Sequence, residues 1–182
     1  QEAPAKKKKP KLSIVDSFKL IASSKYLLLI TILVLGNGIC INLVEGPWKN
    51  KVRALYPSTE LYASFMGNLQ MVTAVAVIVI MIIGANITRL ASWFTAAVIT
   101  PITIIVTGLA FYVLVITNNM GMNILEGLVY SYAPLMLAVY FGFAQNVLSK
   151  ATKYSLFDAT KEMAYIPLDV ELKSKGKAAV DV

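Results

Sequence analysis

Four runs of apolar residues, each about as long as a bilayer is thick, constrain this chain more than any other feature. They cover residues 26–46, 63–85, 93–116 and 128–148. A helix needs roughly 20 apolar residues to cross the hydrocarbon core. Hydrophobic residues make up 57% of the chain and charged residues 15%, whereas a soluble domain has about 45–50% and about 25%. The sequence therefore predicts an all-α integral membrane protein with about four transmembrane helices.

Polar and amphipathic residues precede the first apolar run. Residues 1–12 hold five lysines, and we interpret them as a basic cytoplasmic linker before a membrane fragment at 13–182. A helix is predicted over 13–23, with its apolar residues on one face. Ser13 is expected to cap it, with Asp16 as the second member of a capping-box variant. Such a helix suits the membrane interface.

A second amphipathic segment follows the fourth run. Residues 150–177 are predicted to lie on the cytoplasmic side, and their first part forms a helix that should end at Ile166-Pro167. The next span is expected to open at residue 178. The fold therefore combines about four spans with two amphipathic helices.

The distribution of positive charge predicts the orientation. With four spans, fourteen Lys and Arg residues fall on the side shared by both ends of the chain. The opposite side has three, Lys49, Lys51 and Arg53. Because positive residues accumulate on the cytoplasmic side, both chain ends are predicted to be cytoplasmic. The three exceptions form either a short basic loop or a group of cations that attracts an anionic substrate.

The residue types present argue against metal, cofactor, catalytic and nucleic-acid-binding sites. The chain has no histidine and one cysteine, Cys40, which lies in an apolar run. We therefore expect no metal site and no cofactor. A nucleophile–base pair and a glycine-rich phosphate loop are also missing from the sequence, which argues against an enzyme. The lysines behind the net charge of +7 cluster at the two ends, which favours a membrane surface over nucleic acid.

The densest polar group ends the first apolar run and includes Asn42, Glu45 and Lys49. Pro47 cannot donate a hydrogen bond to the Leu43 carbonyl, so the helix is predicted to kink or unwind there, as in transporter binding sites. An acid inside a membrane is usually functional. The rise of the helix, however, places Glu45 near the far interface, where an ion pair with Lys49 is the alternative.

A second polar group, Gln145 and Asn146, lies near the end of the fourth span. These side chains either line a cavity or form a hydrogen bond between helices. The sequence leaves both interpretations open.

Several motifs together resemble one protein family. The first is NLVEGPWK at residues 42–49, and the second is FMG at 65–67. The longest begins with QNVLSK at 145–150, continues as KYSLFD and KEMAYIPLD, and closes with KGKAA at 175–179. These motifs resemble the ATP/ADP translocases, which are nucleotide transporters of obligate intracellular bacteria and plastids.

The resemblance implies a fold and an activity. It implies a parent of about twelve spans, similar to the major facilitator fold, with this chain at the start of the second half. The implied activity is ATP/ADP exchange by alternating access. The implied partners are the nucleotide, the lipid bilayer and the remaining helices of the parent, without nucleic acid. A bacterial inner membrane is favoured over a plastid inner envelope.

The resemblance also implies roles for residues. A glutamate that the family needs matches Glu45, which would neutralise a cation in the empty state or carry a coupling proton. The cations expected to draw in phosphates are Lys49, Lys51 and Arg53. The polar contacts expected for ribose or base are Asn42, Gln145 and Asn146. At Gly46-Pro47 the chain departs from many exchangers of the family, which leaves the substrate and the coupling mode open.

Three alternatives remain at this stage. A proton-coupled nucleotide symporter of the same family would not need internal ADP. A four-span structural or interaction protein would transport nothing. A membrane enzyme acting on a nucleotide would form a product, but the chain lacks a catalytic pair.

Overall fold

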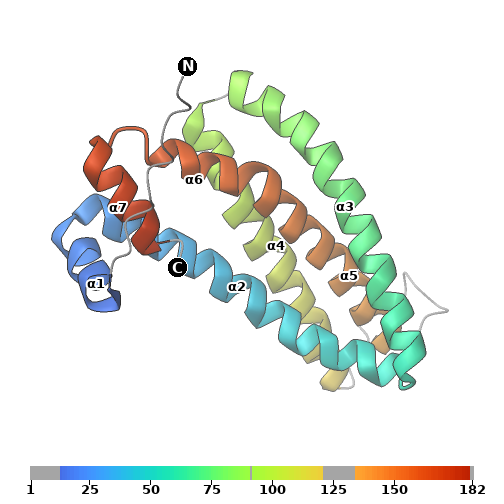
Figure 1. The fold of residues 1–182 in the computed structure, drawn as a ribbon. Coiled ribbons are helices and arrows are strands. Elements are labelled where there is room, and N and C mark those ends of the chain that lie inside the picture. The colour runs from blue at the N-terminus through green and yellow to red at the C-terminus, as the bar shows by residue number, and fades with distance from the viewer. Residues whose placement is uncertain (1–12, 91, 121–133, 181–182) are drawn as a thin grey trace, which may run out of the picture. The chain divides into compact units, whose positions relative to one another are not determined.

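The computed structural model describes residues 13–90, 92–120 and 134–180, and Figure 1 shows their helices. The elements are α1 (Ile14–Ser23), α2 (Lys25–Leu55), α3 (Thr59–Leu90), α4 (Trp93–Asn119), α5 (Pro134–Thr152), the π-helix η1 (Lys153–Phe157), α6 (Asp158–Ala164) and α7 (Val170–Val180). No strand occurs within these ranges. The predicted all-α class is confirmed.

Three of the described helices, α2, α3 and α4, are long and apolar enough to cross a membrane. Many of their large apolar side chains are exposed, among them Ile78 and Ile82 of α3 and Leu109 of α4. Lipid is the solvent that accepts such a surface. The described helices therefore belong to a multi-pass membrane protein.

The helix bounds differ from the predicted spans at two places. The helix that holds the first span continues past residue 46 as far as Leu55. The fourth predicted span begins at residues 128–133, which lie outside the described residues, and its described part belongs to α5. From α5 the chain continues through η1 and α6 to Ala164, so no loop follows residue 148. The helical stretch ends before Pro167, where a stop was predicted.

The described residues form two compact units, and α2 and α6 each contribute to both. The first unit holds the residues up to Gly36 together with those from Lys161 onward. The second holds Asn37–Thr160. Each unit has its own apolar core.

In the first unit, α1 packs against α7. The predicted cap of α1 is confirmed, because the Ser13 hydroxyl accepts a hydrogen bond from the Asp16 amide at 3.2 Å and donates one to the Asp16 carboxylate at 2.7 Å. The core contains Leu27 and Ile30 of α2. A Cβ added at Gly176 of α7 would meet the Leu27 side chain at 2.6 Å, so glycine permits a close approach between the two helices.

In the second unit, the core surrounds Trp48 of α2, which is fully buried. Its indole Nε1 donates a hydrogen bond to the Val139 carbonyl of α5 at 2.8 Å. A Cβ added at Gly142, one turn further along α5, would overlap the Trp48 ring. The indole therefore depends on a glycine at that position, and this packing holds α2 and α5 in close contact.

Of the predicted kink or unwinding at Pro47, the unwinding is wrong, because α2 is a continuous helix through this residue, and the kink stays a prediction. Pro47 leaves the Leu43 carbonyl without its usual helical donor. The Tyr112 hydroxyl of α4 supplies a replacement and donates to that carbonyl at 2.7 Å. A side chain from a neighbouring helix thus satisfies the group that the proline leaves unpaired.

Candidate functional site

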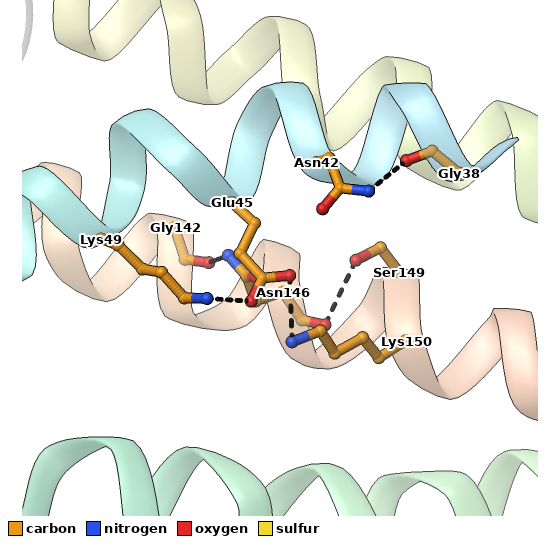
Figure 2. Close-up of polar contacts among 8 residues, drawn as sticks. All are labelled: Gly38, Asn42, Glu45, Lys49, Gly142, Asn146, Ser149 and Lys150. Carbon is orange, nitrogen blue, oxygen red and sulfur yellow. Dashed lines mark hydrogen bonds and ion pairs between the residues drawn. The ribbon is translucent and has the colours of Figure 1, made fainter. Parts of the chain in front are cut away.

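The Glu45 carboxylate lies between two lysine side chains, as Figure 2 shows. Its Oε1 is 2.8 Å from Lys49 Nζ, one turn further along α2. Its Oε2 is 3.2 Å from Lys150 Nζ, which comes from α5. We call Glu45, Lys49 and Lys150 the charge cluster. One carboxylate thus links α2 and α5 through two residues that are 105 positions apart in the chain (150 minus 45).

The three members differ in exposure. The side chains of Glu45 and Lys150 are 15% and 16% exposed, and that of Lys49 is 42% exposed. One negative and two positive groups leave a formal charge of +1, and the side chains of Glu45 and Lys150 are poorly exposed. Charges of this kind are costly in a membrane and are usually functional. The cluster therefore has the sign and the donors needed to bind an anion such as phosphate.

The predicted pair of Glu45 and Lys49 is present, but Lys150 was missed. The sequence analysis placed Lys150 at the start of the cytoplasmic amphipathic segment and Lys49 on the opposite side of the membrane. That separation is wrong, because both lysines contact one carboxylate. The helical bounds explain the difference. Glu45 lies well inside α2, which ends at Leu55, and Lys150 lies within α5.

Two predicted amides lie near the cluster but bond within their own helices (Figure 2). The Asn42 Nδ2 donates to the Gly38 carbonyl at 2.9 Å, and the Asn146 Nδ2 donates to the Gly142 carbonyl at 2.8 Å. Gln145 is also buried, and its Nε2 has no hydrogen-bond partner among the described residues. A buried donor without a partner is uncommon.

The two remaining predicted cations are engaged elsewhere. Lys51 Nζ donates to the Asn119 side chain at 3.2 Å, at the end of α4. The Arg53 guanidinium lies 5.3 Å from the ring centre of Tyr62 in α3, a cation–π distance. The structure does not bring Lys51 or Arg53 into contact with Glu45.

An aromatic group lies at the same end of α2. Phe65 of α3 is 5.0 Å from Tyr56 and 5.5 Å from Phe143, measured between ring centres. The Tyr56 and Tyr140 hydroxyl oxygens are 3.2 Å apart, and this hydrogen bond raises the pKa of Tyr56. Tyr56 therefore adds no charge near neutral pH.

Comparison with known proteins shows the family. A family model described as TLC ATP/ADP transporter matches residues 1–182. The chain belongs to this family. Membership points to a carrier rather than an enzyme, and it agrees with the long apolar helices α2, α3 and α4.

Individual relatives of the TLC family are similar over nearly the whole chain. The ADP,ATP carrier protein 1 of Rickettsia typhi is 51% identical over 97% of this chain and 35% of its own length. The carrier protein 1 of Chlamydia trachomatis is 50% identical over 100% of the chain and 34% of its own length. The chain thus spans about a third of these relatives. No solved structure matches it.

Proposed function

We propose that this chain is part of a nucleotide transporter that exchanges ATP for ADP by alternating access. The observation that carries the proposal is the Glu45 carboxylate shared by Lys49 and Lys150 in a TLC-family chain. A phosphate chain is the anionic part of both substrates, and lysines bind it as point charges. The process is transport, and no covalent bond forms or breaks.

In this mechanism, Glu45 acts as the counter-ion of the two lysines in the empty carrier. An incoming phosphate competes with the carboxylate for Lys49 and Lys150, because one anion replaces another on the same donors. Lys150 is attached to α5 and Lys49 to α2. Release of Lys150 from Glu45 therefore weakens the electrostatic link between α2 and α5, whereas the Glu45–Lys49 pair lies within α2.

The polar neighbours would contribute to recognition. Gln145 has a buried Nε2 without a partner among the described residues, which suits a ribose or base acceptor. Asn42 and Asn146 would join once their amides leave the helix carbonyls that they now contact. Lys51 and Arg53 lie outside the charge cluster and would attract the nucleotide as it approaches.

We propose a bacterial inner membrane with both chain ends in the cytoplasm. The close contact of Lys49 and Lys150 with Glu45 removes one cation from each side of the charge count. Fourteen then becomes thirteen and three becomes two, so the excess still favours a cytoplasmic location for the ends. The remaining helices of the parent and the lipid bilayer are the other partners.

The test is uptake of labelled ATP into vesicles that hold the full-length transporter, with and without ADP inside. Exchange requires internal ADP, and we expect Glu45→Gln to abolish the uptake. Glu60→Gln is the matched control, because Glu60 is an exposed glutamate in the first turn of α3, and this variant should transport as the unchanged protein does.

The alternatives give different results in the same assay. Uptake without internal ADP that follows a proton gradient would replace exchange with symport. A nucleotide product formed in detergent would indicate an enzyme. Absence of uptake by a folded, unchanged transporter under all conditions would contradict the proposal and favour a structural protein.

A further inference from the structure

The apolar face of α1 is divided between two environments. Successive helical residues are rotated by roughly 100°, so Leu20 and Ile21 point to one side, while Ile14, Val15 and Phe18 occupy a neighbouring arc. Ile21 is buried, and Leu20 packs against the core formed with α2 and α7. Ile14, Val15 and Phe18 are 75%, 61% and 70% exposed. Packing within the unit therefore leaves an apolar stripe uncovered.

The position of α1 in the chain indicates what covers this stripe. Only Ser24 separates α1 from α2, which is apolar and long enough to cross a membrane. An apolar stripe tethered to the start of a membrane span lies beside the bilayer surface. Polar residues of the opposite face, such as Asp16 and Ser23, are exposed and are suited to water. This division is typical of a helix that lies in the plane of the interface.

The charge of the segment indicates which lipids it prefers. Lys19 borders the stripe and Lys25 begins α2, and both are exposed. Residues 1–25 contain seven lysines and two acidic residues, which gives a charge of +5 (seven minus two). Basic residues beside a bilayer attract anionic headgroups. Insertion of apolar side chains and attraction of the headgroups therefore act together.

We propose that α1 is an anionic-lipid-binding helix, in which Ile14, Val15 and Phe18 insert among the acyl chains and Lys19 and Lys25 contact lipid phosphates. The site is separate from the charge cluster and does not depend on nucleotide transport. Its ligand is an anionic phospholipid of the leaflet next to α1.

The test uses the full-length transporter with its other cysteines replaced, in phosphatidylcholine liposomes with or without phosphatidylglycerol. A nitroxide is attached at Phe18→Cys, at Ile14→Cys as a second stripe position, or at Ser23→Cys as the control on the opposite face. Collision with oxygen reports lipid, and collision with a water-soluble nickel complex reports water. We expect oxygen to dominate at positions 14 and 18 and nickel to dominate at position 23.

The preference of α1 for anionic lipid is tested by the substitution Lys19→Gln, with the nitroxide label at position 18. Each basic residue near an anionic surface changes membrane affinity by about fivefold. We therefore expect the substitution to shift the label toward nickel collisions only when phosphatidylglycerol is present. An unchanged ratio in both lipids would overturn the lipid preference. Nickel-accessible labels at 14 and 18, or labels shielded from both reagents by protein, would overturn the bilayer contact.

Discussion

Both units contain a glutamate–lysine pair, and their surroundings differ. In the second unit, Glu45 is 15% exposed and contacts two lysines from two helices. In the first unit, Glu162 is 50% exposed and contacts Lys177, which is 44% exposed. Water can replace either partner of the exposed pair. In the charge cluster, loss of the carboxylate leaves Lys150, which is 16% exposed, without its counter-ion in a poorly solvated position. The same residue types therefore have different consequences.

The largest expected effect comes from removing each carboxylate in turn. Glu45→Gln leaves Lys150 poorly solvated and without its counter-ion, and we expect a loss of about 3–5 kcal/mol in unfolding free energy. Glu162→Gln should change it by less than about 1 kcal/mol, because exposed pairs contribute little. Thermal unfolding of the full-length transporter in detergent measures both. Equal losses in the two variants would mean that burial does not distinguish the pairs.

Two glycines, one in each unit, lie close to side chains of a neighbouring helix, so their replacement compares the packing of the two units. Gly142→Ala places a Cβ into the rigid Trp48 indole, and we expect a loss of about 1–3 kcal/mol. Gly176→Ala meets the end of the flexible Leu27 side chain, which can rotate away at a smaller cost. Gly67→Ala is the control, because nothing lies within 4 Å of its added Cβ, and it should be neutral or stabilising. A Gly142→Ala protein as stable as Gly67→Ala would contradict the close packing of α2 on α5.

Two tyrosine hydroxyls each donate a hydrogen bond to a backbone carbonyl, and their removal compares the stability that each bond contributes. Tyr112→Phe leaves the Leu43 carbonyl without its donor beside Pro47, and we expect a loss of about 1–2 kcal/mol. Tyr26→Phe removes a donor from the Ala164 carbonyl at the last residue of α6. The turn that follows includes Ile166, which is 66% exposed, so a small shift of this helix end can hydrate the carbonyl. The effect of this substitution should therefore be smaller, about 0.5 kcal/mol. The same unfolding assay ranks the two, and the reverse order would show that Tyr112 does not compensate for the proline.

The smallest expected effect is the coupling between Glu45 and Lys49. A half-exposed pair one helical turn apart contributes about 0.3–0.5 kcal/mol. A double-mutant cycle with Glu45→Gln and Lys49→Met should give a value of this size. The matching cycle with Lys150→Met should give a larger coupling, because Lys150 is less exposed and belongs to another helix. Equal coupling energies would contradict this distinction within the cluster.

The sequence predicted local features and missed long-range ones. Apolar length located α2, α3 and α4, and the Ser13–Asp16 pattern located the cap of α1, because each depends on neighbouring residues. Lys150 was assigned to the amphipathic segment after the fourth span because the fourth apolar run ends at residue 148, whereas this residue belongs to α5. Nothing in the local sequence shows that Lys150 faces Glu45.

The prediction of unwinding at Pro47 failed for a similar reason. Proline removes a donor in any helix, and the sequence analysis correctly identified the Leu43 carbonyl as the affected group. The replacement donor is the Tyr112 hydroxyl, which lies on α4 and is far away in the chain. Tertiary packing thus decides whether a proline interrupts a membrane helix.

The most direct test of a phosphate site at the charge cluster is nucleotide binding to the purified full-length transporter. Lys150→Met retains a side chain of similar length and leaves Glu45 paired with Lys49, so the fold should persist. We predict that it weakens ATP and ADP binding about 10- to 100-fold, because a hydrogen bond to a charged group contributes about 1.5–3 kcal/mol, while Lys19→Met binds normally. A folded Lys150→Met transporter with unchanged affinity for both nucleotides would contradict a role for the cluster in binding phosphate.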